Sequence, residues 1–214
     1  MQDWNELYEK GETPWDKGIH TPVLDDLLKK MPRFFQGRVL VPGCGIGHDA
    51  RRLADHGCQV VGIDIASLAI ERAKQADTEH RVDFRFANLF ELPEDLRGTF
   101  DLVWEHTCLC ALDPSLREKY IAAVRGALKP GGKVAGVFYM NPDMDPGETG
   151  PPFGITLDEL IALWEKGGFE VDEHWVPEVA YEGRAGRERF MLLKRTVGRL
   201  CQTAKISKLR SQAV

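Results

Sequence analysis

The sequence predicts an α/β domain in which a mostly parallel sheet is covered by helices on both faces. Short apolar, β-branched runs alternate with helical segments along most of the chain, a pattern typical of parallel strands joined by crossover helices. A strand that ends in glycines and leads into a helix, at positions 39–47, supports the same class. The length of 214 residues suits one domain with a full core.

Each element is predicted from its own pattern. Apolar runs predict strands at 38–42, 58–64, 82–87, 100–105, 133–140, 169–176 and 187–194. Helical patterns occupy 47–56, 66–76, 114–128 and 156–166. Gly57 is placed to end the first helix, and Pro114 falls in the first turn of the third. Thr156 is placed to cap the last helix, which Gly167 ends.

Composition narrows the class of protein. The net charge of -5 gives no general affinity for nucleic-acid phosphates. No apolar run reaches the ~20 residues of a membrane helix, and the N-terminus does not resemble a secretory signal. Five scattered cysteines indicate reduced thiols and a cytoplasmic protein. The pair Cys108 and Cys110 lacks a second pair at ligand spacing, so no metal site is expected.

Two segments fall outside the alternation of strands and helices. Residues 1–35 contain three aromatic side chains, Trp4, Tyr8 and Trp15. Residues 196–214 are basic and contain no acidic residue. We expect this tail to be weakly docked, with a binding arm as the alternative, and we place the folded domain at 1–195.

The glycine turn predicts a nucleotide-like cofactor. Gly43, Gly45 and Gly47 follow a strand and open a helix in the spacing G-x-G-x-G, where backbone can approach a ligand without Cβ interference. Asp64 ends the next strand, and a carboxylate there can accept hydrogen bonds from both ribose hydroxyls of an adenosine. Asp49, just inside the helix, is expected to cap its N-terminus. A dinucleotide would favour one more residue between the glycines, which argues against an oxidoreductase.

With these motifs in place, the chain resembles the class I S-adenosylmethionine-dependent methyltransferases of the thiopurine methyltransferase-like superfamily, and within it the thiol and halide methyltransferases. The resemblance covers positions 4 to about 195. Besides the glycine turn, it is carried by four segments: 4–16 with its Thr-Pro-Trp-Asp, 100–107, the Leu-Lys-Pro-Gly-Gly at 128–132, and 150–153.

This resemblance implies a Rossmann-like seven-stranded sheet whose last strand is antiparallel, with residues 1–35 folded as a helical lid over S-adenosylmethionine. Aromatic rings of such a lid stabilise a sulfonium and exclude water; the alternative is that they only anchor the lid to the core. The implied cofactor-binding residues are Trp4, Tyr8, Trp15, Gly43, Gly45, Gly47, Asp64, Ile65, Asn88, Leu89, Phe90 and Glu105.

The methyl acceptor is expected beside the end of the fourth strand. Glu105 and His106 are the predicted catalytic residues, and His106 stands where the resembling group has tyrosine. Imidazole titrates near neutral pH, so His106 is a candidate contact or proton acceptor for a thiol, or else a loop histidine satisfied by solvent. We expect a small apolar pocket formed by the N-terminal segment, 105–110 and 150–153, in which Trp15, His106, Pro152 and Phe153 bind the acceptor.

The predicted activity is methyl transfer by direct displacement from S-adenosylmethionine to a small nucleophile, a thiol, hydrosulfide or halide. Alignment and exclusion of water supply most of the acceleration for such a step. Other small acceptors (amine, hydroxyl, selenium or tellurium species) and a non-catalytic cofactor-binding module stay open. No nucleic-acid or membrane partner is expected, and the protein is predicted to be a monomer or a homodimer.

Overall fold

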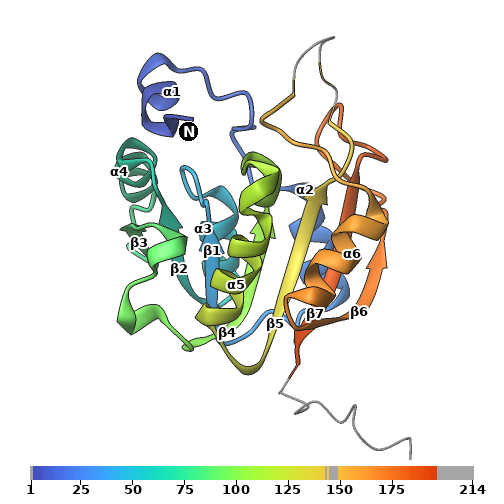
Figure 1. Ribbon diagram of the computed structural model, residues 1–214. Helices are drawn as coiled ribbons and strands as arrows, with labels where there is room; N and C mark the ends of the chain where they lie inside the picture. The colour runs from blue at the N-terminus through green and yellow to red at the C-terminus, as the bar shows by residue number, and fades with distance from the viewer. Residues whose placement is uncertain (1, 143, 145–148, 197–214) are drawn as a thin grey trace, which may run out of the picture.

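The computed structural model describes residues 2–142, 144 and 149–196. The basic tail predicted at 196–214 therefore lies almost wholly outside the described residues. The described chain forms one seven-stranded sheet with helices on both sides (Figure 1). The strands are β1 (Arg38–Pro42), β2 (Gln59–Asp64), β3 (Val82–Phe86), β4 (Phe100–His106), β5 (Leu128–Tyr139), β6 (Phe169–Trp175) and β7 (Glu188–Arg195).

The strand order is β3-β2-β1-β4-β5-β7-β6. Strands β1 to β5 pair in parallel, whereas β7 pairs antiparallel with both β5 and β6. The predicted antiparallel last strand is thus confirmed. The order reverses between β1 and β4, and open α/β sheets bind ligands beyond the carboxyl ends of their strands at such a point.

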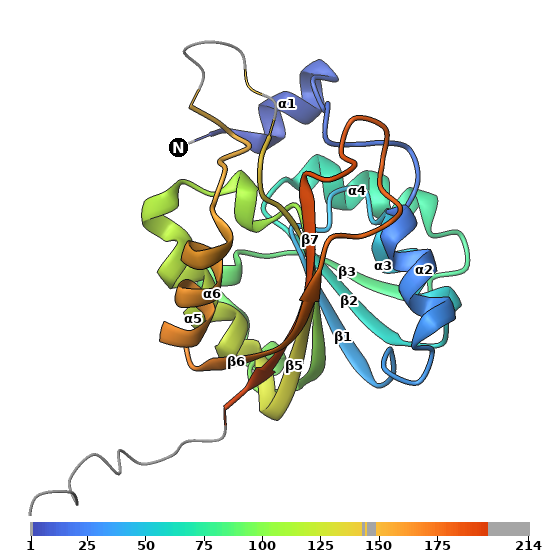
Figure 2. The same cartoon turned by 90° about the vertical axis from the view of Figure 1, so that its right-hand side faces the viewer.

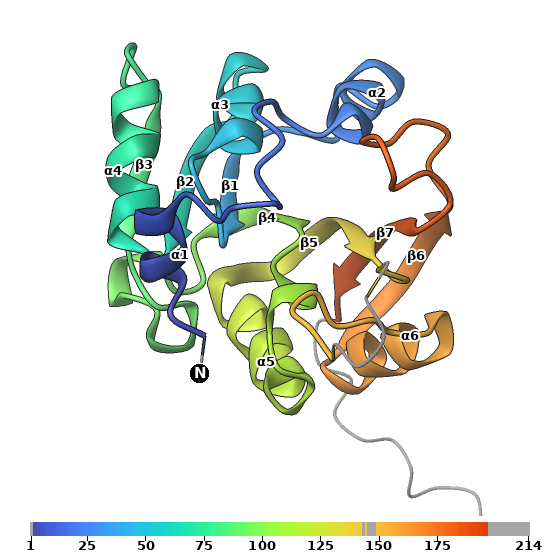
Figure 3. The same ribbon diagram turned by 90° about the horizontal axis from the view of Figure 1, so that it is seen from above.

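Helices cover the two faces of the sheet as two separate layers. They are α2 (Pro22–Lys30), α3 (His48–Asp55), α4 (Ser67–Ala76), α5 (Arg117–Ala127) and α6 (Leu157–Lys166), while α1 (Trp4–Lys10) lies apart from both layers. Viewed from above, α2, α3 and α4 lie on one side and α5 and α6 on the other (Figure 3). The first group packs on Trp104 and the second on Val103, because successive residues of a strand point to opposite faces.

Helix α1 lies over the carboxyl edge of the sheet and packs on α4 (Figures 1 and 2). The residue before α4 is Ala66, which has no side chain to cap the helix. Asn5 of α1 provides the cap instead, since its Oδ1 accepts hydrogen bonds from Leu68 N at 3.0 Å and Ser67 Oγ at 3.1 Å. The guanidinium of Arg72 also donates to the carbonyl oxygen of Tyr8 at 2.9 Å. Of the lid predicted from residues 1–35, α1 is therefore attached to the first turns of a core helix, whereas α2 and Phe35 belong to the core on one face of the sheet.

Three features differ from the prediction. The expected helix at 114–128 begins as a 3-10 turn, Pro114–Leu116, before α5, and β5 begins at Leu128 rather than Lys133. The pairing of β4 with β5 is irregular between Phe100 and Leu102 and regular from there to His106. Helix α2 was missed, although Thr21 caps it and Pro22 occupies its first turn.

Candidate active site

The glycine turn between β1 and α3 has the backbone conformation that its sequence predicts. Gly43, Gly45 and Gly47 have φ values of 58°, 54° and 80°, a region that residues with a Cβ rarely enter. A Cβ on Gly43 would lie 2.9 Å from the sulfur of Cys108, and one on Gly45 would lie 3.0 Å from the hydroxyl of Tyr8. The turn thus brings bare backbone to the carboxyl edge of the sheet, between β4 and the lid.

Asp64 joins this turn to the end of β2. Its two carboxylate oxygens accept hydrogen bonds from Gly45 N and Ala66 N, each at 2.9 Å. Burial raises the pKa of Asp64 above its usual value, although these backbone donors oppose the shift. Each oxygen retains a lone pair, so the carboxylate is held in place with acceptor capacity left for ribose hydroxyls.

The lid brings its three predicted aromatic residues together beside the turn. The ring of Trp15 meets Trp4 edge-on, with centroids 5.3 Å apart, and Tyr8 likewise at 5.8 Å. The indole N–H of Trp15 donates to the hydroxyl of Tyr8 at 3.3 Å. Tyr8 is buried, whereas Trp4 and Trp15 are only partly covered. Tyr8 is thus the anchor of the lid, and the two tryptophans have ring surface left for a ligand.

Residues after β2 and β3 supply a second, more apolar part of the edge. Ile65 is 47% exposed although it follows the buried end of β2. Asn88 caps a 3-10 turn, Leu89–Glu91, by accepting a hydrogen bond from Phe90 N at 3.0 Å. The exposed apolar side chain beside a fixed polar one suits a flat aromatic ring such as adenine.

Glu105 and His106 end β4 and point to opposite faces of the sheet. Glu105 Oε1 accepts hydrogen bonds from Cys108 N at 2.9 Å and Leu109 N at 2.8 Å, which shapes the turn after the strand. Its Oε2 is buried and has no partner among the described residues. Burial raises the pKa of Glu105 to about 7.

His106 lies against Asp49, whose predicted role as a helix cap is wrong. No side chain caps the N-terminus of α3. The Asp49 side chain instead turns inward, where Oδ1 accepts from Thr21 N and Oδ2 accepts from Trp104 Nε1 and His106 Nδ1, each at 2.8 Å. Three such donors stabilise a buried carboxylate better than solvent would at the helix start.

His106 and Asp49 each stabilise the charged form of the other. Burial alone would lower the pKa of His106, but the charge and hydrogen bond of Asp49 outweigh it and raise that pKa. Burial likewise opposes ionisation of Asp49, yet His106 and the other donors hold its pKa below the usual value. The Nε2 atom of His106 is buried and has no hydrogen-bond partner among the described residues.

The connection between β6 and β7 closes over the imidazole. Tyr181 stacks on His106 with centroids 5.9 Å apart, and its hydroxyl donates to Ile19 O at 2.7 Å. Arg184 lies over the ring of Tyr139 at 4.7 Å and pairs with buried Glu188 at 3.2 Å. These residues were not identified from the sequence, because nothing local distinguishes them from ordinary loop residues.

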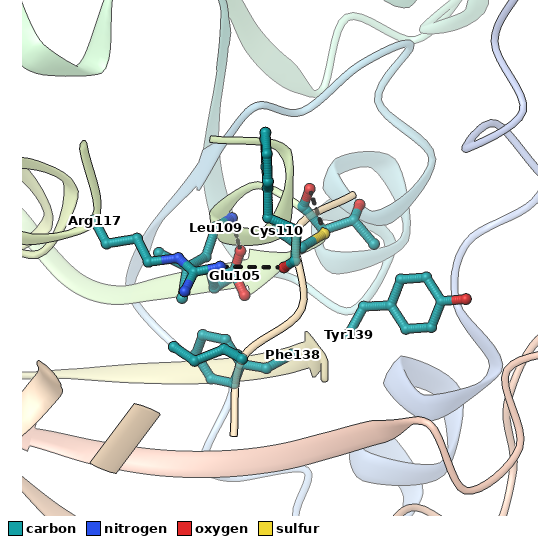
Figure 4. A pocket seen from close by; sticks show the side chains of 9 residues that line it. Glu105, Leu109, Cys110, Arg117, Phe138 and Tyr139 are labelled. Carbon is teal, nitrogen blue, oxygen red and sulfur yellow. Dashed lines mark hydrogen bonds between the residues drawn. The ribbon is translucent and has the colours of Figure 1, made fainter. Parts of the chain in front are cut away.

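A cavity on the Glu105 face joins two of the three segments predicted to surround the acceptor. Its lining side chains nearly fill it and leave room of about 10 Å³, enough for about one water molecule. Figure 4 shows Leu109, Cys110 and Phe138 gathered around it with Glu105 and Arg117, while Tyr139 points away. Phe153 also lines it, as expected, but neither Pro152, Trp15 nor His106 does.

The fold and the edge together define a class I methyltransferase that uses S-adenosylmethionine. Bare backbone at the glycine turn, an anchored Asp64 and partly exposed indoles fit a cofactor with a ribose and a sulfonium. The sequence profile of the family described as thiopurine S-methyltransferase matches residues 1–193. The chain belongs to this family, and it is a small-molecule methyltransferase.

Two plant relatives are similar over most of their length. Probable thiol methyltransferase 2 of Arabidopsis thaliana is 32% identical over 191 residues, which cover 87% of this chain and 82% of the relative. Thiocyanate methyltransferase 1 of Brassica oleracea is 33% identical with the same coverage of both chains. The thiopurine S-methyltransferase of Bos taurus is 28% identical, covering 77% of this chain and 75% of the relative.

Solved structures agree on the fold. A protein from a study of the conversion of a disulfide bond into a thioacetal group during echinomycin biosynthesis has a TM-score of 0.73 at 21% identity, with 88% of this chain and 89% of that chain covered. A methyltransferase from Methanosarcina mazei described as SAM-dependent has a TM-score of 0.65 at 26% identity, with 75% and 93% covered. Among the described residues, no helix is long and apolar enough to cross a membrane.

Proposed function

We propose that this enzyme transfers the methyl group of S-adenosylmethionine to a small sulfur nucleophile, a thiol or hydrosulfide. Thiol and thiocyanate methyltransferases of about a third identical sequence support sulfur as the acceptor atom. The protein is proposed to act on free small molecules, not on nucleic acid.

One observation carries the choice of sulfur: the buried imidazole of His106, whose Nε2 has no partner among the described residues. The cysteine thiol has a pKa of about 8.5, and Asp49 raises the pKa of His106 above the ~6.5 of ordinary imidazole, so the two values approach each other. An alcohol is far too weak an acid for the same base, and an iodide has no proton to give up. His106 therefore suits an S–H acceptor better than a hydroxyl or a halide.

The other side chains have supporting roles in this proposal. Gly43, Gly45 and Gly47 hold the cofactor by backbone, and Asp64 binds its ribose. Trp4 and Trp15 cover the sulfonium with ring faces, since a cation is stabilised there and water is excluded. The remaining proposed contacts to the cofactor are Tyr8, Ile65, Asn88, Leu89, Phe90 and Glu105, and those to the acceptor are Trp15, His106, Pro152 and Phe153.

Bound S-adenosylmethionine supplies an activated methyl group on a good leaving group, so the protein needs to align the acceptor and keep water out. Glu105 fixes the backbone turn that follows β4. We infer that its second oxygen contacts the cofactor. No further acid is needed, because the thioether that leaves is neutral.

The test is formation of S-adenosylhomocysteine with a panel of acceptors: hydrosulfide, methanethiol, benzenethiol, thiocyanate, iodide, an amine and an alcohol. We expect turnover with hydrosulfide and methanethiol that exceeds turnover with iodide. Turnover restricted to iodide, the amine or the alcohol would exclude a sulfur substrate while leaving the methyltransferase assignment intact. Binding of the cofactor with no turnover of any acceptor would indicate a binding module.

A further inference from the structure

Asp49 contacts the imidazole of His106, and neither the glycine turn nor the sheet edge explains its function. Asp49 lies 57 positions before His106, yet its Oδ2 is 2.8 Å from the imidazole Nδ1. Only 10% of the Asp49 side chain and 11% of the His106 side chain are exposed. A buried carboxylate at one ring nitrogen and an unpartnered atom at the other is the arrangement of a base held by an orienting group.

We propose that Asp49 is a positioning residue that fixes the tautomer of His106, so that Nε2 removes the proton of a thiol and the resulting imidazolium holds the sulfur as an anion. This inference rests on the proposed transfer to sulfur. Asp49 accepts the Nδ1 proton, which leaves the lone pair of neutral imidazole on Nε2.

The step balances as an acid–base transfer followed by a displacement. The S–H bond of the acceptor breaks as an N–H bond forms at Nε2, and the thiolate remains beside the imidazolium. The sulfur then bonds the methyl carbon while the bond from that carbon to the sulfonium breaks with its electron pair, leaving S-adenosylhomocysteine. The imidazolium releases its proton to water after the methyl thioether leaves.

The residues around the imidazole favour an ion pair between Asp49 and its Nδ1 side, and they leave Nε2 buried. The charged and titratable groups that act on it come from every element packed around it: Asp49 of α3, Glu105 of β4, Tyr181 and Arg184 of the β6–β7 connection, and Glu188 of β7. Arg184 and Glu188 pair with each other, so their opposite charges largely cancel at His106. Asp49 is left as the dominant charge, and it raises the pKa of His106.

Two acceptors separate this role from simple support of the fold. A thiol must lose a proton, whereas thiocyanate is an anion without one. With methanethiol, kcat/KM of the wild type should rise through the pKa of His106 and fall through that of the thiol. With thiocyanate, it should fall as pH rises through the pKa of His106, because only the imidazolium donates strongly to an anion.

The decisive variant is Asp49→Asn. Its amide can donate to Nδ1, which reverses the tautomer and places a proton on Nε2. At pH 7 we expect kcat/KM for methanethiol to fall at least 100-fold, in line with loss of a general base. The loss for thiocyanate should be less than 10-fold, since a neutral Nε2–H still donates to an anion. The bell-shaped pH profile of kcat/KM for methanethiol should be replaced by a simple rise with pH that follows the concentration of thiolate.

Trp104→Phe is the matched control, because it removes another donor to the same Oδ2 and leaves the bond to His106 in place. It should destabilise the core but keep the wild-type pH profile and ratio of the two acceptors. His106→Gln tests the dyad from the other side and keeps Asp49 with its two other donors, Thr21 N and Trp104 Nε1. This variant should lose the bell-shaped pH profile of kcat/KM for methanethiol, and its KM for thiocyanate should rise.

Calorimetry with S-adenosylmethionine checks that each variant remains folded. The proposal would be overturned if Asp49→Asn or His106→Gln kept the wild-type pH profile of kcat/KM for methanethiol and the wild-type ratio of kcat/KM between methanethiol and thiocyanate. Failure of the wild type to methylate any sulfur acceptor would instead overturn the proposed function, so the two failures are distinguishable.

Discussion

The attachment of the lid to helix α4 can be tested at Asn5. Substitution by Ala removes the oxygen that caps α4, where Leu68 N and Ser67 Oγ both donate to it. Loss of a helix cap costs about 1 kcal/mol, and a second hydrogen bond between side chains adds about 0.5–1.5 kcal/mol. Because the second contact is only partly buried, we expect a total of about 1–2 kcal/mol in lid docking, roughly a 5–30-fold change in its equilibrium.

The effect should appear in the lid and in the cofactor, not in α1 by itself. Alanine favours helix formation more than asparagine, which offsets the loss of the exposed hydrogen bond from Asn5 Nδ2 to Glu9 Oε1 within α1. Hydrogen exchange of the amides of α1 should accelerate, and the Kd for S-adenosylmethionine measured by calorimetry should rise by up to the same factor. Glu9→Ala is the control, since it removes the hydrogen bond between Asn5 and Glu9 within α1, keeps the Asn5 oxygen that caps α4, and should stay close to wild type.

Wild-type exchange rates in α1 together with a wild-type Kd in Asn5→Ala would refute the reasoning. They would mean that the aromatic cluster and the hydrogen bond from Arg72 to Tyr8 O hold the lid and that the cap is a by-product of packing. Faster exchange with an unchanged Kd would keep the cap but remove the lid from cofactor binding.

Two further predictions concern carboxylates at the edge of the sheet. Asp64→Ala should weaken binding of S-adenosylmethionine at least 100-fold in calorimetry, because charge-assisted hydrogen bonds to two hydroxyls contribute about 1.5–3 kcal/mol each. Asp64→Asn should lose less affinity. Equal affinity in the wild type and both variants would exclude Asp64 from the ribose site. The pKa of Glu105 is raised by burial to about 7, so its contribution to stability is full below about pH 4.3 and is lost as pH rises through 7. Relative to wild type, Glu105→Gln should therefore gain up to about 4 kcal/mol in free energy of unfolding between pH 4.3 and 8 in urea titrations. A difference independent of pH would contradict the buried, protonated state.

The parts of the fold that sequence could predict are those determined by neighbouring residues. The glycine turn has its positive φ values where the spacing placed them, since a strand, a tight turn and a helix follow one another within ten positions. Thr156 caps α6 and Gly167 ends it, again by contacts within a few residues. Helix α2 carried equally local signals in Thr21, Pro22 and its apolar spacing, and it was missed because the segment was interpreted only as a lid.

The site was less predictable because its decisive contacts join distant positions. Asp49 looked like a helix cap, for its place near the start of α3 satisfies the local rule. Its three donors come from positions 28, 55 and 57 residues away, and the placement of β4 beside β1 brings two of them, Trp104 and His106, to it. Tyr181 reaches His106 for the same reason, through the position of β7 between β5 and β6.

The alternation of Glu105 and His106 has a consequence for engineering this enzyme. The two side chains serve opposite faces of one strand, so inserting or deleting a single residue between Leu102 and His106 would exchange them. Upstream, the irregular pairing between Phe100 and Leu102 can absorb a change of length. A redesign or loop graft therefore has to keep the number of residues between Leu102 and His106 as well as the identities of Glu105 and His106.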